Sequence, residues 1–489
     1  MLSGAAKGLI FGQSGRSLAL FRDITTIPII TMRRDLNHAP AVARRDRVFG
    51  RDSPGFFREL RAGLVLIACS STTFGAFQEP APEQEEELTP KQRIERLEQR
   101  NAELERRLDV LAGDFERFTL GDLVPPIGES EHGLGPAASK VYGIEQGLSI
   151  GGYGEALHQN FDDDDDSGAP SGKSDSLDFL RAVFYFGYKF DEHWVLNTEL
   201  EIEHADEVFL EFGTLDYLMH PALSFRAGLL LVPMGFLSEL HEPTTFLSAR
   251  RPQTETLILP STWRENGAGV HGELGDFAYR SYVINGFDAE GFSSSGLRGG
   301  RQKGSQAVAE DLAWVTRVDW AGAPGITVGG SVYFGKSGQD QIPGADVDTE
   351  IQELHLEWRW RGLRARALAS HAELDEVADL NAFKGLTGQS SVGRELDGWY
   401  VELGYDLLAW LAPEQRPSLT PFARFESLDT QSKVPNGFSS DPASDSQVWT
   451  FGCSWQPIPS IVLKVDYEDF DNRADTGVDQ FNLAIGYLF

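Results

Sequence analysis

From about residue 140 to the C-terminus, apolar and polar residues alternate with a period of two. In the final segment, aromatic or aliphatic residues occupy every second position: Phe481, Leu483, Ile485, Tyr487 and Phe489. The positions between them hold smaller or polar residues: Asn482, Ala484 and Gly486. Successive side chains of a β-strand point to opposite faces, so this alternation predicts strands with one apolar and one polar face.

Sixteen such segments can be marked along the chain. They are 141–158, 177–190, 193–204, 207–220, 222–234, 266–274, 277–287, 310–320, 325–336, 349–361, 363–374, 395–408, 418–428, 446–456, 460–471 and 478–489. Many have about 10 to 14 residues, which is long for a soluble sheet but suits a tilted membrane span. Alternation alone would also fit a sandwich or a propeller with one solvated face.

The connections between these segments favour a barrel. Those after even-numbered segments are mostly tight turns, whereas the long polar ones follow odd-numbered segments: 159–176, 235–265, 288–309, 337–348, 375–394 and 429–445. Bacterial outer-membrane barrels combine an even strand count with short turns at one end and long loops at the other. No stretch of 18 uncharged apolar residues occurs, which argues against a transmembrane helix. We therefore predict an all-β fold, a transmembrane antiparallel β-barrel of about 16 strands over residues 140–489.

Tryptophans near the strand ends fit the aromatic belts found at membrane interfaces. They are Trp194, Trp314, Trp320, Trp358, Trp360, Trp399, Trp410, Trp449 and Trp455. Each one alone would be explained by core packing, and only their joint placement is informative.

Residues 1–76 have the features of a leader. Arg58 and Arg61 precede the apolar run 64–69, and small residues end at Ala76, which is the order of a secretory signal peptide. We expect a mature N-terminus near residue 77 and attribute the long basic stretch 1–55 to a misassigned start codon. The alternative is a lipid on Cys69, because 66–69 resembles a lipoprotein cleavage box. Residues 77–90 form an acidic, proline-rich linker.

Residues 91–120 are predicted to form a short coiled-coil helix. The residues at heptad spacing are Ile94, Leu97, Asn101, Leu104, Leu108 and Leu111, with charged residues at most other positions. The buried amide expected at Asn101 would fix the register and the number of helices. We favour a coiled coil between copies of the chain over a helix lying on its own domain, because polar segments flank it. Residues 121–139, including Pro125 and Pro126, are interpreted as a second linker.

Composition narrows the function. A net charge of -31 repels nucleic acid, and 11% aromatic residues are too many for a disordered acidic chain. The cysteines and histidines lack zinc spacing, and no cofactor motif, nucleophile elbow or phosphate-binding glycine loop occurs. We expect no enzyme activity, no metal and no cofactor.

Several segments carry a family resemblance. The stretch 226–235, RAGLLLVPMG, followed by 241–246, HEPTTF, resembles the strand-and-loop signature of phosphate-selective porins of the O/P type. Segments 259–272 and 282–286 continue the likeness, which covers roughly 140–489. The last residues, Tyr487 to Phe489, match the aromatic signal read by the outer-membrane assembly machinery.

The resemblance implies a Gram-negative outer-membrane porin, homotrimeric and surrounded by lipid and lipopolysaccharide. Its third outer loop, here 235–265, would fold inward and narrow the channel. Phosphate-selective members rely on ladders of lysine and arginine, and this chain departs from them in having few lysines.

Alternation predicts which charged residues face the lumen. The predicted inward arginines are Arg226, Arg280, Arg317, Arg359, Arg361, Arg364, Arg366 and Arg424. Glu199, Glu201 and Glu203 should form an acidic wall opposite the basic strands, giving a transverse field that favours anions on the arginine side. For any single arginine, the alternative is an ion-paired or solvated charge without a role in selectivity.

In the third loop, we expect Arg250 or Arg251 to reach the constriction. The aspartate run 162–166 lies in the first outer loop, and we favour a solvated charge run over a calcium site or a bridge to lipopolysaccharide cations. The predicted function is passive diffusion of small hydrophilic solutes, with phosphate-like anions as the candidate class. The alternative is a structural barrel that tethers the envelope to peptidoglycan through a periplasmic coiled coil.

Overall fold

The computed structural model describes residues 89–117, 127–410 and 417–489. The predicted leader, 1–76, and most of the first linker lie outside the described residues. The same holds for 118–120 at the end of the predicted helix and for 121–126 of the second linker. Helix α1 (Pro90–Arg117) coincides with the predicted coiled-coil segment. None of the helices in the described part of the chain has the length and hydropathy that a membrane-crossing helix requires.

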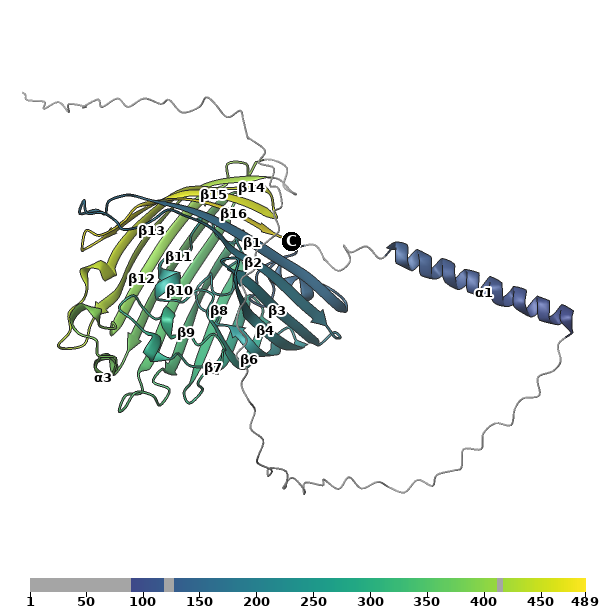
Figure 1. The fold of residues 1–489 in the computed structure, drawn as a ribbon, viewed down its shortest axis with the longest axis horizontal. Coiled ribbons are helices and arrows are strands. Elements are labelled where there is room, and N and C mark those ends of the chain that lie inside the picture. The colour runs from purple at the N-terminus through teal and green to yellow at the C-terminus, as the bar shows by residue number, and fades with distance from the viewer. Residues whose placement is uncertain (1–88, 118–126, 411–416) are drawn as a thin grey trace, which may run out of the picture. The chain divides into compact units, whose positions relative to one another are not determined.

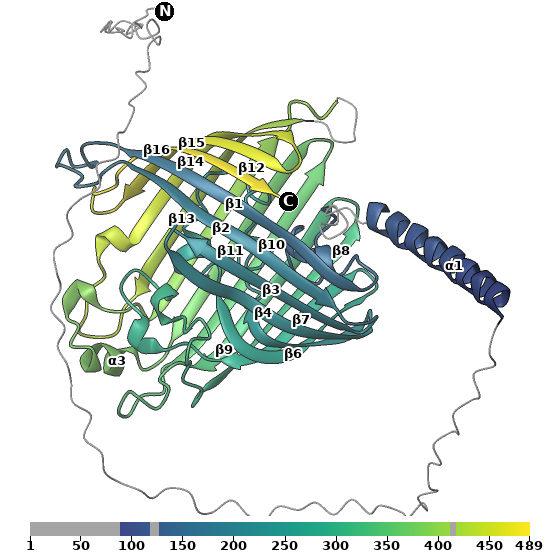
Figure 2. The ribbon, with the colours of Figure 1, turned by 45° about the vertical axis from the view of Figure 1, so that its right-hand side comes forward.

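Sixteen antiparallel strands close into one barrel (Figure 1), as the alternation predicted. They are β1 (Gly147–Phe161), β2 (Ser176–Lys189), β3 (Trp194–Glu203), β4 (Glu207–His220), β5 (Leu223–Leu231), β6 (Arg264–Leu274), β7 (Phe277–Asn285), β8 (Leu312–Ala323), β9 (Ile326–Lys336), β10 (Asp348–Trp360), β11 (Leu363–Leu374), β12 (Glu395–Tyr405), β13 (Ser418–Lys433), β14 (Asp445–Ile458), β15 (Ile461–Asn472) and β16 (Gln480–Leu488). Each strand pairs with its neighbours in sequence, and β1 pairs with β16, for example Tyr153 with Leu488. Figure 2 shows these two strands side by side where the sheet closes.

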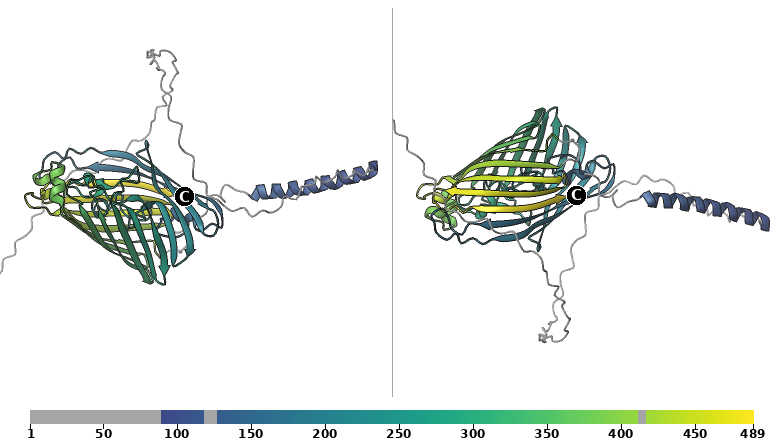
Figure 3. Two further views of the ribbon diagram at one scale, coloured as in Figure 1. Left: turned by 90° about the horizontal axis from the view of Figure 1, so that it is seen from below. Right: turned by 90° about the horizontal axis from the view of Figure 1, so that it is seen from above.

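The short helical elements lie in the connections. They are α2 (Thr254–Leu257), α3 (Val377–Phe383) and the 3-10 turns η2 (Ala138–Val141), η3 (Ala289–Gly291), η4 (Arg298–Gly300), η5 (Gly388–Ser390) and η6 (Pro442–Ser444). Short and long connections alternate as predicted, with two exceptions. Residues 204–206 after β3 are short, and residues 406–417 after β12 are long. The two views in Figure 3 show the C-terminus at one end of the barrel and α3 at the other.

The two faces of the sheet differ as the alternation predicted. On β16, Phe481, Leu483 and Ile485 are exposed on the outer face, whereas Gln480 and Asn482 are buried on the inner face. Eight of the nine tryptophans assigned to the belts are exposed outside, and Trp320 is half-buried. Because neighbouring strands repeat this pattern, the outer surface is apolar and the inner surface carries most of the buried charge.

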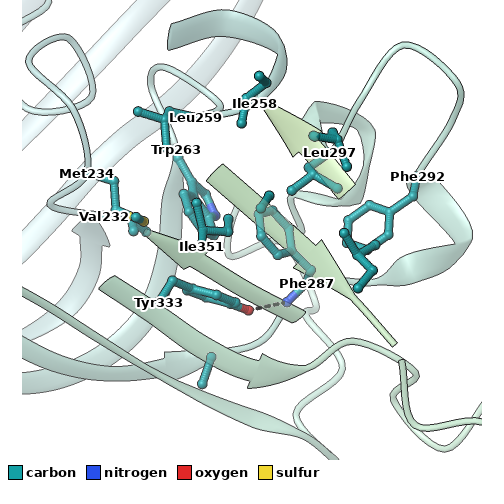
Figure 4. Packing of buried hydrophobic residues seen from close by; sticks show 14 of the residues in the cluster. Val232, Met234, Ile258, Leu259, Trp263, Phe287, Phe292, Leu297, Tyr333 and Ile351 are labelled. Atoms are coloured by element: carbon teal, nitrogen blue, oxygen red, sulfur yellow. Dashed lines mark hydrogen bonds between the residues drawn. The ribbon is translucent and has the colours of Figure 1, made fainter. Parts of the chain in front are cut away.

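The interior is not uniformly polar, contrary to the expectation from sequence. Connections 232–263 and 286–311 pack Trp263, Phe287 and Phe292 against inward-facing Tyr333 and Ile351 (Figure 4). The ring of Trp263 stacks on Phe287 with 4.3 Å between centroids, and the Tyr333 hydroxyl accepts a hydrogen bond from Phe287 N at 3.1 Å. Two long connections therefore have an apolar core of their own inside the barrel.

Residues 127–146 also lie within the barrel. This segment includes 127–139 of the stretch interpreted as a linker, and its Leu134, Ala137 and Val141 are buried against inward residues of β1, β2 and β3. Strand β1 consequently begins at Gly147, six residues later than predicted.

Candidate functional site

The connection between β5 and β6, residues 232–263, crosses the interior, and we call it the internal loop. Its backbone receives hydrogen bonds from, or donates them to, inward side chains of widely separated strands. Arg317 on β8 donates to Gly235 O, Thr254 N donates to Glu426 on β13 at 3.2 Å, and Ala249 N donates to Asp466 on β15. Polar wall residues thus hold the loop from several sides.

The two loop arginines predicted at the constriction differ in their surroundings. Arg250 is half-buried and forms an ion pair with Glu468, with 2.7 Å between Nη1 and Oε2. Arg251 has no ion pair among the described residues, and its buried Nη2 has no hydrogen-bond partner there. Burial and the positive charge of Arg181 lower the pKa of Arg251. Of the two internal-loop arginines, Arg251 is therefore the one whose charge is less compensated.

Five of the predicted wall arginines are buried inside the barrel, and each faces a carboxylate. They are Arg226, Arg280, Arg317, Arg366 and Arg424. The shortest ion pairs are 2.8 Å from Arg226 to Asp216, 2.6 Å from Arg280 to Asp319, 2.9 Å from Arg317 to Asp319, 2.6 Å from Arg366 to Glu357 and 3.0 Å from Arg424 to Glu426. Their placement follows the alternation, but their charges are largely neutralised, which was the alternative considered for each.

Three further predicted arginines lie near the turn between β10 and β11. Arg359 is 61% exposed and pairs with Glu357 at 3.0 Å, and Arg364 pairs with Glu357 at 3.4 Å. Arg361 differs from the prediction. It lies in the tight turn at φ 46°, with its guanidinium 5.1 Å from the centre of the outward Trp360 ring. The turn breaks the alternation, so Arg361 is not a residue of the strand wall.

The three predicted glutamates of β3 form an acidic wall, but neighbouring basic side chains partly neutralise its negative charge. Glu201 and Glu203 lie 3.4 Å and 4.0 Å from the guanidinium of Arg181, and Glu199 lies 3.3 Å from Nε2 of His241 in the internal loop. Sequence analysis missed Arg181, although the same alternation on β2 places it inward beside Val183. Because Arg181 neutralises this wall, the simple transverse field expected from the sequence is weakened.

Three further cations without an ion pair lie in the connection between β7 and β8, where sequence analysis named none. Arg298 and Arg301 donate to the carbonyl oxygen of Ser261 at 2.9 Å each, and the ammonium of Lys303 lies 6.0 Å from the centre of the Phe209 ring. No ion pair of these three residues is found within the described ranges. A cavity of about 350 Å³ is lined by all three.

The arginines of this cavity remain charged at neutral pH. Burial, followed by the charges of Arg301 and Arg251, lowers the pKa of Arg298 to about 9. Burial also lowers the pKa of Arg301 to about 10, although Glu211 opposes this shift. Their loop position explains why alternation missed them, since they belong to no strand. We call Arg251, Arg298, Arg301 and Lys303 the basic cluster.

A second cavity, of about 430 Å³, lies beside the turn that joins β10 and β11 and beside the end of β14. It is lined by Arg359, Arg361 and Arg364 together with the internal-loop residues Thr244 and Leu247. Arg361 thus lines this cavity from the turn, even though it is not in the wall. Guanidinium groups therefore line hollows on both sides of the internal loop.

The remaining predicted sites are placed as follows. The a and d residues of α1 that can be described, among them Ile94, Leu97 and Leu108, are exposed in the single chain, and the side chain of Leu111 lies outside the described residues. Tyr487 faces outward, and the backbone of Phe489 bonds to Gly152, so the C-terminus completes the closure of the barrel. Within the described ranges, no cluster of three or more histidine, cysteine or acidic side chains could hold a metal ion.

Comparison with known proteins finds a sequence relative and several solved structures of outer-membrane proteins. No family model matches the chain. The solved structures that resemble it include Salmonella typhi OmpF in complex with daunomycin (TM-score 0.47, 11% identity, covering 70% of this chain and 98% of that one). Another is outer-membrane expressed OmpT of Vibrio cholerae (TM-score 0.42, 11% identity, covering 70% and 97%). An uncharacterized protein of Aquifex aeolicus is 35% identical over 394 residues, which cover 77% of this chain and 87% of that protein. The chain therefore belongs to the same family as this Aquifex aeolicus protein.

Proposed function

We propose that this protein is a porin of a Gram-negative outer membrane, through which small hydrophilic solutes diffuse passively. The barrel itself supports a membrane location. Its outer face exposes aliphatic and aromatic side chains on neighbouring strands, for example Leu354, Leu356 and Trp358 on β10. Such a continuous surface is unfavourable in water, whereas a closed sheet satisfies every backbone group within lipid.

We further propose that anions are the preferred solutes, with phosphate-like oxyanions as the candidate class. The observation that carries this proposal is the basic cluster. Its four cations have no carboxylate partner among the described residues, whereas the predicted strand arginines are ion-paired. An anion that enters the cavity beside Arg298 and Arg301 would meet guanidinium groups suited to oxyanions. The total charge of the chain does not oppose this, because field strength in a narrow space depends on the nearest groups.

Planar-bilayer recording of the purified protein tests this proposal. Wild-type channels should conduct, and their reversal potential in a salt gradient should show a preference for anions. Replacing Arg298, Arg301 and Lys303 together by alanine should lower the anion-to-cation permeability ratio. R473A is the matched control, because Arg473 is exposed on a long connection and pairs with Asp445 at 2.8 Å. A silent wild-type barrel would contradict the channel, and an unchanged ratio in the triple variant would contradict the anion preference.

A second candidate function is an envelope tether. Exposed apolar residues on α1, such as Ile94 and Leu108, favour association of this helix with another helix. We propose that α1 lies in the periplasm, joins copies of the chain into a homotrimer and provides a link toward peptidoglycan. Binding of purified protein to cell-wall sacculi, compared with a variant lacking 88–120, would distinguish this function from the channel.

A further inference from the structure

Residues 127–146, which we call the inner plug, are attached to the inner side of the barrel wall by hydrogen bonds. The Nζ of Lys189 donates to Tyr142 O at 3.0 Å, and the side-chain amide of Gln146 donates to Phe190 O at 2.8 Å. The two wall residues, Lys189 and Phe190, lie at the short turn that joins β2 and β3. The plug therefore sits at the end of the barrel that carries the short turns.

Two glycines on the inner face make room for the plug. A Cβ at Gly187 would lie 2.5 Å from the Cβ of Val141, and a Cβ at Gly151 would lie 2.8 Å from Ala137 O. Any other residue at these positions would overlap the plug. The wall and the plug are thus complementary in shape at two separate points.

Polar contacts fix the plug further. Asn197 on β3 donates to Ala138 O at 2.9 Å, and Arg226 on β5 donates to His132 O at 3.1 Å. On the other side, the carboxylate of Glu242 in the internal loop accepts hydrogen bonds from Ala137 N at 2.9 Å and Ala138 N at 3.1 Å. The plug consequently bridges the wall of β1–β5 and the internal loop.

The plug covers carboxylates. The Tyr142 hydroxyl donates to Asp216 at 2.8 Å, and Gly133 approaches Glu239 so closely that a Cβ there would lie 2.6 Å from Oε1. With Glu242, three buried acidic side chains lie against the plug, and two of them are ion-paired, Asp216 with Arg226 at 2.8 Å and Glu239 with Arg280 at 3.2 Å. The hollow at the other half, on the side of β10–β14, is lined instead by Arg359 and Arg364.

We propose that the inner plug is a selectivity element. It closes the half of the inner mouth beside β1–β5 and directs solutes past Arg359 and Arg364. This inference rests on the proposed channel function and deepens it, because it assigns a role in anion selectivity to a segment outside the barrel strands. Without the plug, the mouth beside β1–β5 would open a second route whose charges are paired, as Asp216 is with Arg226 and Glu239 with Arg280, so this route would not favour anions.

Two variants displace the plug without altering the wall. V141D places a carboxylate against Gly187, and a second variant replaces 128–142 with a Gly/Ser sequence of equal length. In both, single-channel conductance should rise on the order of twofold, because the open cross-section grows, and the anion-to-cation permeability ratio should fall. S130D is the matched control, since it adds the same charge at an exposed position of the same segment and should change neither quantity. Heat-modifiable migration on gels confirms that each barrel is folded.

A third substitution tests the route itself. R359A should lower the anion preference of the wild type, and it should have a smaller effect when 128–142 is replaced, because solutes then bypass Arg359. The plug would have no role in selectivity if folded V141D and Gly/Ser barrels conducted with wild-type conductance and reversal potential. Wild-type and plug variants that are all silent would instead contradict the channel proposal, so the two failures can be told apart.

Discussion

At the scale of single residues, most buried charges of the interior are paired with a charge of opposite sign. Buried guanidinium groups on the strands each face a carboxylate, as Arg424 faces Glu426, because an unpaired buried charge is costly. The exceptions are therefore informative. Arg251, Arg298 and Arg301 are half-buried without an ion pair within the described residues, and such groups are expected where a ligand or solute supplies the missing charge.

Replacing Arg250 and Arg251 by alanine should lower the anion-to-cation permeability ratio. Their field should matter most at low salt, since charges are screened over about 10 Å at 0.1 M salt but only about 3 Å at 1 M. Reversal potentials measured at both salt concentrations test this. R250K together with R251K keeps both charges and should retain the preference. Equal reversal potentials for the alanine variant and the wild type at low salt would place the solute path elsewhere.

A buried carboxyl in the internal loop should make stability depend on pH. Burial raises the pKa of Glu242 from 4.5 to about 7, against the hydrogen bonds from Ala137 N and Ala138 N. A raised pKa in the folded state gives stability that is full below the unfolded value of 4.5 and is lost as the pH rises through about 7. E242Q keeps an acceptor oxygen but does not titrate.

Between pH 5 and pH 8, E242Q should therefore gain up to about 3 kcal/mol of stability relative to the wild type. The midpoint of heat-induced unfolding on gels at both pH values measures the difference. E145Q serves as the control because Glu145 is an exposed carboxyl of the inner plug. A constant difference between E242Q and the wild type across this range would show that Glu242 does not titrate there.

At the scale of elements, the internal loop is held by an apolar core as well as by charges. Trp263 is buried, and its ring contacts Phe287 and Tyr333, with centroids 4.3 Å and 5.1 Å away. Loop 286–311 supplies Phe287, so each long connection helps to fix the other. The rigid placement of the loop thus depends on packing between connections, not on either connection alone.

Trp263→Ala should destabilise this core by about 3 to 5 kcal/mol, the usual cost of removing a buried aromatic side chain. The freed loop should give larger and noisier single-channel currents, recorded in planar bilayers. Trp410→Ala is a suitable comparison, because Trp410 is 75% exposed and should affect neither stability nor current. Quiet, wild-type currents from W263A would mean that the charged contacts alone hold the loop.

At the scale of the whole molecule, helix α1 exposes apolar side chains that no other described residue covers. Leu97 and Leu104 of α1 are 58% and 49% exposed, which is unfavourable for leucine unless another helix covers them. We expect association of the chain to be strengthened by this helix beyond what the barrel alone provides.

Replacing Leu97 and Leu104 by glutamate should weaken the oligomer, because charges at a and d positions cannot be buried between helices. Chemical crosslinking in mild detergent and unheated gels would detect the loss. E105Q changes an exposed position on the same helix and should leave the oligomer intact. An L97E/L104E oligomer as resistant to heat as the wild type would indicate that α1 packs elsewhere.

The sequence by itself determined the barrel. A period of two is a local property of each strand. Because each face of the sheet must be either apolar or polar, every second residue is restricted to one of these two types. Hence the sixteen strands, their boundaries to within a few residues in most cases, and the inward side of residues such as Arg226 and Glu201 could be predicted from the sequence. Arg361 was misassigned because alternation ends at the strand boundary.

Tertiary structure alone decided what the interior does. The partner of each inward charge, the path of the internal loop, the basic cluster and the inner plug all depend on contacts between distant residues. Glu242 meets Ala137 across 105 residues, and Ser248 meets Arg424 across 176. Such pairs have no period and no shared motif, because they follow from how a closed barrel brings its strands, loops and N-terminal segment into one enclosed space.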